Sequence, residues 1–250
     1  MKGEIGMSGL LPTLYAFFVE KLPYVTIVVF SFGMALRLYR WLNAPREPTT
    51  PKLNIAYSLK YIILDVILFR KTFQRDKGTW LVLFLFHACI AGILFGHMRG
   101  FYLWSASLFY PLGQIFADFM VHTLPIYVGW VFIVTQILLL IRRRRLEGNQ
   151  LTSITTDYVT LILLLATSIV GQGMRIFPPE AVPAEVYNIV FIPGLIVLHL
   201  EAVPSYHWFH VHVLLTQLLV MYAPYSKLIH TISGVISPAI YGSWRKRYDI

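Results

Sequence analysis

The sequence predicts an all-α integral membrane protein, a single domain of about five transmembrane helices with the N-terminus outside and the C-terminus in the cytoplasm. Of its 250 residues, 57% are hydrophobic and 13% are charged, whereas a soluble domain averages about 45–50% and about 25%. The apolar residues gather in runs of the length that crosses a bilayer as a helix. The charges flank these runs, as membrane topology requires, so the net charge of +9 does not indicate a nucleic-acid partner.

Five apolar runs are the expected spans, and each is long enough or nearly long enough to cross the membrane. They cover residues 13–36, 80–98, 119–141, 158–174 and 207–222. Glu20 and Lys21 lie in the first half of the first run, so a start near Leu22 is equally compatible with its sequence.

Lys and Arg alternate between rich and poor connections, which sets the expected orientation. The segment 37–79 carries nine of them and four arginines follow the third span, whereas the loop after the second span has only Arg99 and the loop 171–206 only Arg175. The rich connections are therefore expected on the cytoplasmic side.

Two stretches fit neither a span nor a simple loop. Residues 53–69 are largely apolar but contain Lys60 and Asp65, so we expect an amphipathic helix on the cytoplasmic surface rather than a sixth span. Residues 186–200 are short and contain Pro193, which favours an interfacial or re-entrant segment on the outer side.

The chemistry is expected at histidines of the second and fifth spans, because an ionisable side chain within the membrane is costly and marks a functional site by default. His87 and His97 are ten residues apart, about 15 Å along a helix. His212 and His230 are eighteen residues apart, or five helical turns, although Pro224 interrupts the helix between them. If the two spans run antiparallel, His97 lies level with His212 near the outer face, and His87 with His230 near the inner face.

Two haem groups, which are flat and largely apolar, suit these two pairs. Two imidazoles saturate the iron, so we expect electron transfer rather than oxygen activation. Gly92 and Gly96 lie near the ligands and would make room for a porphyrin. His207 and His210 compete with His212, although His210 points about 160° away from it on an ideal helix.

An alternative from another class is a haem-free membrane anchor or proton-coupled transporter, whose histidines pack or relay protons. The single cysteine, Cys89, lies within the second span and is expected to be an ordinary buried residue.

The stretch HACIAGILFGH, followed by HVHVLLTQLLVMYAPYSKLIH, resembles the gamma subunit of respiratory nitrate reductases. The ten- and eighteen-residue spacings and the segment 224–228 carry this resemblance. The stretch LKYIILDVILFRKTFQRDKGTW resembles the related cytochrome b subunits of sulfite-reduction-associated and heterodisulfide-reductase-like menaquinol complexes, and we favour that branch. The resemblance implies two haem b groups, with His97 and His212 on the outer haem iron and His87 and His230 on the inner haem iron.

The resemblance also implies a quinone site beside the outer haem. Gly96 matches the glycine that precedes the ligand in that family, but the lysine that nitrate reductases place at the start of the third span has no counterpart. Asp118, His122 and Arg99 are the candidates to carry quinone protons in its place.

The expected function is therefore that of an electron-transfer subunit in the cell membrane. Menaquinol would give electrons to the outer haem, and these would pass through the inner haem to a cytoplasmic iron–sulfur subunit, of heterodisulfide-reductase or nitrate-reductase type, in an anaerobic respiratory complex. The basic segment 37–79 and the tail WRKRYDI would dock that subunit. Flow toward quinone is equally compatible with the sequence, because haem potentials depend on partners and surrounding hydrogen bonds.

Overall fold

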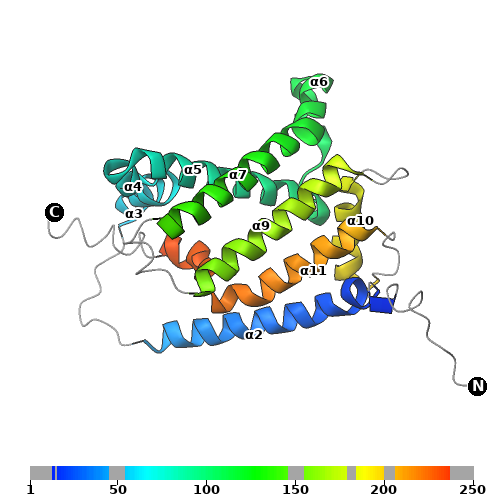
Figure 1. Ribbon diagram of the computed structural model, residues 1–250, viewed down its shortest axis with the longest axis horizontal. Helices are drawn as coiled ribbons and strands as arrows, with labels where there is room; N and C mark the ends of the chain where they lie inside the picture. Colours follow the sequence, from blue (N-terminus) through cyan, green and yellow to red (C-terminus); the bar gives the residue numbers. More distant parts are fainter. Residues whose placement is uncertain are drawn as a thin grey trace, which may run out of the picture.

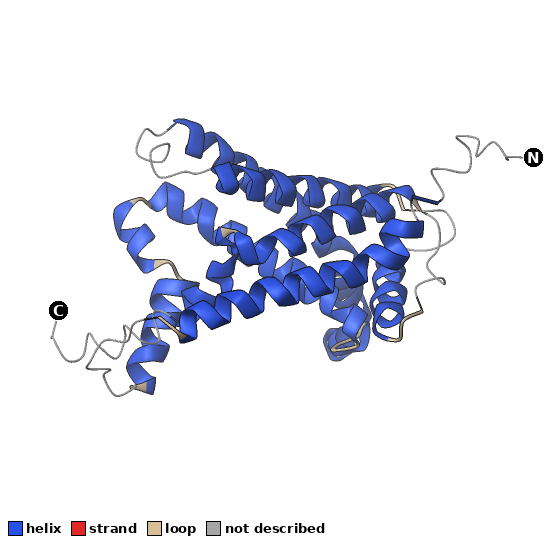
Figure 2. Cartoon of the chain, turned by 90° about the horizontal axis from the view of Figure 1, so that it is seen from below, coloured by secondary structure: helices blue, strands red, loops and turns tan. Residues whose placement is uncertain are grey.

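The computed structural model describes residues 13–14, 16–44, 54–145, 155–178, 184–199 and 206–236, and within these ranges it contains helices and no strand (Figure 2). The main helices are α2 (Leu22–Leu42), α5 (Lys77–His97), α7 (Leu124–Arg145), α9 (Thr155–Ile176) and α11 (His207–Tyr222). The shorter elements are η1 (Phe17–Lys21), α3 (Ile55–Tyr61), η2 (Ile62–Ile67), α4 (Arg70–Arg75), η3 (Met98–Phe101), η4 (Ala106–Leu112), α6 (Gln114–Asp118), η5 (Phe119–Thr123), α10 (Ala184–Ile196), η6 (Ala223–Tyr225) and η7 (Lys227–Ile229).

The main helices pack in a row. Helix α5 packs on α7, α7 on α9, α9 on α11, and α11 on α2; Figure 1 shows α7, α9, α11 and α2 side by side. Helix α5 carries His87 and His97 and helix α11 carries His212, yet in the described part of the chain α5 and α11 are not a closely packed pair. The sequence led us to expect direct neighbours. Instead, their backbones stay apart and their histidine side chains meet between them.

Within the residues that the structure describes, four helical runs are long and apolar enough to cross a membrane. They are Phe17–Leu42, Lys77–Phe101, Gln114–Arg145 and Thr155–Ile176. At most a third of the most apolar window of each run is buried inside the protein, so most of these apolar side chains face outward, as lipid contact requires. The predicted all-α, multi-pass membrane fold is thereby confirmed. Helix α11, the fifth expected span, has 16 residues, or about 24 Å, which is less than the hydrocarbon core of about 30 Å.

The first and fourth spans differ from expectation at their ends. Glu20 and Lys21 fall in the π-helical turn η1, and α2 begins at Leu22, the alternative start that these charges had indicated. Helix α9 has 22 residues and ends at Ile176, so residues 171–176, expected in the outer loop, are helical. The first turn of α9 buries the carboxylate of Asp157, and this burial is tolerated because the carboxylate pairs with two cations, Arg143 and Lys227.

The described part of the stretch 53–69 contains α3 (Ile55–Tyr61) and η2 (Ile62–Ile67), which together are too short to span the membrane. The chain then reverses at Phe69, which has a φ of +49°, and enters α4. Asp65 pairs with Arg70 at 2.9 Å across this reversal, and the indole N–H of Trp80 donates to the carbonyl of Leu68 at 2.8 Å. The basic segment 37–79 therefore contains a helical hairpin that is fixed to the start of α5.

Helix α10 occupies the other ambiguous stretch. It has 13 residues, contains Pro193 and packs on η3, directly after α5. This length is again too short for a span.

Buried amides and hydroxyls join the main helices. Gln217 of α11 accepts a hydrogen bond from Thr26 of α2 at 3.1 Å and donates to the carbonyl of Phe18 at 2.8 Å. Gln136 of α7 is fully buried and donates to the hydroxyl of Ser168 of α9 at 3.0 Å. Such interhelical hydrogen bonds stabilise membrane helix pairs by about 0.6 kcal/mol on average, and here they fix the row that positions the histidines.

Candidate functional site

Four histidines form two facing pairs at two levels of the bundle. The rings of His97 and His212 have centroids 6.3 Å apart and lie nearly parallel, at 20°. The rings of His87 and His230 have centroids 6.2 Å apart and lie nearly perpendicular, at 84°. We call the first pair the outer site and the second the inner site, after the membrane faces at which the sequence led us to expect them. The structure thus brings together the same partners that the ten- and eighteen-residue spacings had suggested.

Each of the four rings is held in the same way, with Nδ1 at hydrogen-bond distance from a backbone carbonyl. The acceptors are the carbonyls of Leu83 for His87 at 2.8 Å, Ile93 for His97 at 2.8 Å, Thr167 for His212 at 3.1 Å, and Lys227 for His230 at 2.6 Å. Because a carbonyl can only accept, Nδ1 donates its proton there, which leaves Nε2 as the nitrogen available to bind a metal. This is the arrangement that metal-binding histidines typically show, with one nitrogen donating and the other binding the metal.

The spacing of the rings fits a metal ion between them. A bond of about 2.0 Å from each Nε2 to a first-row metal ion, with about 1.2 Å from that nitrogen to the ring centre, gives a centroid separation of about 6.4 Å. In the described part of the chain, no group of three or more His, Cys, Asp or Glu side chains comes together as a metal site. A two-histidine site needs four further donors, which the four nitrogens of a porphyrin supply. The residues present therefore fit haem.

Helix α9 completes the outer site, which the sequence did not reveal. Its residues Thr167, Gly171 and Arg175 are spaced by four and so lie on one face of the helix. Thr167 supplies the carbonyl for His212, and the ring of His212 packs on Gly171, where an added Cβ would lie 2.9 Å from Cε1. Arg175 interacts electrostatically with His97. The sequence signal that could have pointed to this face is Gly171, because a small residue within a span lets another helix approach closely.

Two aromatic rings contact His87 at the inner site. Phe86 precedes it on α5, with ring centroids 5.1 Å apart, and Phe69 approaches it from the turn between η2 and α4, with centroids 4.7 Å apart. Phe69 was likewise missed, because it is remote in sequence and its turn carries no glycine or asparagine to mark it.

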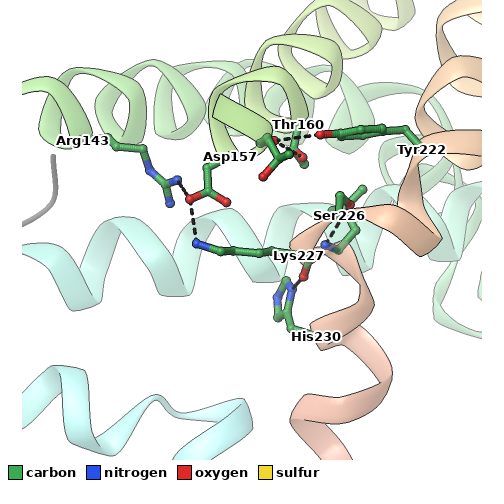
Figure 3. A network of polar contacts seen from close by, with 9 residues as sticks. Arg143, Asp157, Thr160, Tyr222, Ser226, Lys227 and His230 are labelled. Atoms are coloured by element: carbon green, nitrogen blue, oxygen red, sulfur yellow. Dashed lines mark hydrogen bonds and ion pairs between the residues drawn. The ribbon is translucent and has the colours of Figure 1, made fainter. Parts of the chain in front are cut away.

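Figure 3 shows a polar network beside His230. Asp157, in the first turn of α9, has a side chain that is 4% exposed; it accepts a hydrogen bond from Lys227 Nζ at 2.7 Å and forms an ion pair with Arg143 Nη1 at 2.9 Å. The main chain of Lys227 in turn holds His230. Three elements, α7, α9 and η7, thus meet at this carboxylate.

The glycines near the ligands have the open surroundings that a cofactor would need. An added Cβ at Gly96 would meet nothing within 4 Å, and one at Gly92 would meet only Val128, at 4.0 Å. The competing histidines lie elsewhere: His210 is buried beside Phe209, and His207 is exposed at the start of α11. Of the three histidines at this end of α11, His212 is the one that faces His97.

The three candidate proton carriers lie beyond the end of α5 or before α7. The guanidinium of Arg99, in η3, lies over the ring of Trp104 with Cζ 5.4 Å from its centroid. Asp118 accepts a hydrogen bond from Gln114 at 2.9 Å on the exposed side of its own helix, and His122 is exposed in η5. Arg99 and Asp118 therefore each contact a nearby residue of the connection between α5 and α7, and neither of these two contacts involves a histidine of the outer site.

Comparison with known proteins agrees with this geometry. The family described as nitrate reductase gamma subunit matches residues 73–245, a range that includes all four paired histidines. The chain is also 26% identical over 253 aligned residues to the Hdr-like menaquinol oxidoreductase cytochrome b-like subunit of Archaeoglobus fulgidus, an alignment that covers 86% of this chain and 76% of the relative. The match extends over well more than half of the sequence, and the chain belongs to the nitrate reductase gamma subunit family.

Proposed function

We propose that this chain is the di-haem cytochrome b subunit of a menaquinol oxidoreductase complex. It would transfer electrons between menaquinol near the outer face of the membrane and a cytoplasmic iron–sulfur subunit. One observation carries this proposal. His97 faces His212 and His87 faces His230, and the rings of each pair are separated by the distance expected when two histidines bind one iron. In all four rings Nδ1 lies at hydrogen-bond distance from a backbone carbonyl.

Haem bound at the two sites would carry single electrons across the membrane, and the protein's own groups would hold and tune it. The four carbonyl acceptors orient the imidazoles and keep each Nε2 unprotonated for the iron. The open face at Gly96 leaves room for the macrocycle. The positive charge of Arg175 beside His97 favours the reduced state at the outer site and suits an anionic propionate.

The positive charges gathered at one end of the bundle support the proposed orientation. The start of α5 and the end of α7 meet where Arg142 pairs with Asp76 at 3.4 Å, and Arg143 and Lys227 lie beside the inner site (Figure 3). This end also carries the arginines of α4 and of the last turn of α7. By the positive-inside rule it would face the cytoplasm, which places the inner site next to the proposed iron–sulfur partner.

The relative from Archaeoglobus fulgidus is named as part of a menaquinol oxidoreductase, which supports menaquinol as the substrate. Quinol oxidation releases protons, and Arg99, Asp118 and His122, which lie in the connection between α5 and α7, are the proposed groups that receive them. An oxidation at that end would release these protons on the outer side.

A reduced-minus-oxidised spectrum of the purified protein, with haem quantified per chain, tests the proposal. We expect two b-type haems. His87→Ala and His97→Ala should each remove a different haem, whereas His207→Ala, at an exposed histidine of α11, should keep both. A single haem would mean that one pair is misassigned, and a colourless protein would favour the haem-free anchor or transporter.

A further inference from the structure

The last of the four histidines does not lie on the helix that carries its sequence neighbour His212. Helix α11 ends at Tyr222, and the 3₁₀ turns η6 and η7 intervene before His230. A continuous helix would fix both ligands on one face, but a helix interrupted at Pro224 does not. The position of His230 must therefore be set by contacts of this turn with the rest of the bundle.

The beginning of the turn is held by α2. Arg37 Nε donates to the carbonyl of Pro224 at 2.8 Å, and Gly33 is packed so closely against the turn that an added Cβ would lie 2.7 Å from the Cβ of Pro224. The hydroxyl of Ser226 then caps η7 by accepting from the amide of Leu228 at 3.1 Å. These contacts fix residues 224–226, which lie four or more residues before the ligand.

Lys227 is the residue that joins the turn to both the ligand and the bundle. Its carbonyl accepts from His230 Nδ1 at 2.6 Å, and its ammonium group pairs with Asp157 at 2.7 Å. The Lys227 side chain is 59% exposed, whereas that of Asp157 is 4% exposed. The ammonium group could therefore turn toward solvent, and the buried carboxylate is what keeps it directed into the bundle.

The carboxylate also balances charge at this end of the bundle. Asp157 lies between Arg143 and Lys227, so the three groups together carry a charge of +1. Without the anion, two cations would face each other beside the inner site. Only the carboxylate of this group is buried, so without it nothing among these three groups would hold the more exposed Lys227 ammonium group against the bundle.

We propose that Asp157 is a positioning residue for the inner haem. Through Lys227 it would hold His230 in place as a ligand, and through its charge it would lower the reduction potential of the iron bound there. This inference rests on the proposed function and adds to it a residue on α9 that acts through Lys227 rather than as a ligand.

Asp157→Asn tests the proposal in the full-length protein, with the outer haem of the same molecule as an internal reference. We expect haem per chain to fall from two toward one, with the loss confined to the inner haem. In the fraction that retains both haems, we expect the inner haem to titrate at a higher potential. Its ferric low-spin EPR signal should also change while that of the outer haem stays constant. The two signals should be separable, because the imidazole planes are nearly perpendicular at the inner site and nearly parallel at the outer site.

Two further variants separate positioning from general stability. Asp157→Glu keeps the charge and should restore the inner haem in part. Asp76→Asn removes a carboxylate that pairs with the neighbouring Arg142 at 3.4 Å but has no contact with η7 among those described, and it should leave both haems unchanged. If Asp157→Asn does not accumulate, Lys227→Met replaces it as the decisive variant, because it leaves the Arg143–Asp157 pair intact.

Unchanged inner-haem occupancy, potential and EPR signal in Asp157→Asn would overturn the inference. Loss of both haems in parallel would overturn it too, because Asp157 would then only support the fold. Failure of the proposed function looks different: the wild-type protein would lack the inner haem, or His230→Ala would retain it.

Discussion

The packing of His212 on Gly171 allows a single methyl group to test the outer site. In Gly171→Ala the new Cβ would lie 2.9 Å from Cε1 and 3.2 Å from Nδ1 of His212. Ordinary contacts begin at 3.4 Å, so the ring or the two helices must move apart by about half an ångström. A shift of the ring away from α9 would lengthen its hydrogen bond to Thr167 from 3.1 Å to about 3.5 Å, where such bonds are largely lost.

The size of the effect follows from these two changes. Overpacking costs typically about 1–3 kcal/mol, and the weakened hydrogen bond costs about 1 kcal/mol. Part of this is relieved by relaxation of α9, so a net loss of about 2–3 kcal/mol is expected, which corresponds to roughly 30- to 150-fold weaker haem binding. Alanine is the better helix former by about 1 kcal/mol, so the fold without haem should not be weakened to the same extent.

The assay is titration of haem into the apoprotein, followed by the low-spin EPR signals of the two sites. We expect Gly171→Ala to bind its outer haem more weakly and its inner haem as the wild type does. Gly234→Ala is the matched control, since an added Cβ there meets nothing within 4 Å, and it gains helix propensity without a clash. Wild-type affinity at both sites in Gly171→Ala would refute the packing argument, and selective loss of the inner haem would refute the assignment of His212 to the outer site.

Three further predictions follow from the described contacts. Gly96→Leu should fold normally, since nothing lies within 4 Å of its Cβ position, but should lose outer-haem occupancy; full occupancy would show that the porphyrin does not cover this face. Thr26→Val removes the hydrogen bond to Gln217 and should lower the free energy of unfolding by about 0.6–1.7 kcal/mol, measured by denaturant titration in detergent; no change would show that this bond does not stabilise the α2–α11 contact. The hydrogen bond from the Thr79 hydroxyl lowers the pKa of Asp76, so the ionised carboxylate stabilises the fold at neutral pH. The stability difference between wild type and Asp76→Asn should therefore shrink as the pH falls below about 4, and a difference that persists there would contradict this explanation.

Hydropathy and spacing predicted the parts of this structure that the membrane itself dictates. In lipid, each spanning segment must satisfy its own backbone hydrogen bonds, so an apolar run such as Lys77–Phe101 can be recognised from its sequence. Helical periodicity then restricted which histidines could face each other. The offset between His87 and His97 is matched by the offset between His212 and His230 in the structure, even though Pro224 breaks the second helix.

What could not be predicted is the contribution of elements that are close in space but distant in sequence. Thr167 acts through its carbonyl, which every residue possesses, so its type carries no signal. Phe69 adopts a left-handed backbone conformation, which glycine or asparagine usually indicates in a sequence. Asp157 lies at the start of an apolar helix, where the sequence alone suggests an ordinary solvated carboxylate, because the two cations that pair with it come from other helices. These three positions depend on tertiary packing alone.

The separation in sequence between the paired histidines has a consequence for how the protein is made. The partners at each site are separated by more than a hundred residues, so neither site exists on the nascent chain until α11 and the turn after it have entered the membrane. Cofactor loading would then be among the last events of biogenesis. Iron at the outer site would link α5 to α11, and iron at the inner site would link α5 to the turn after α11.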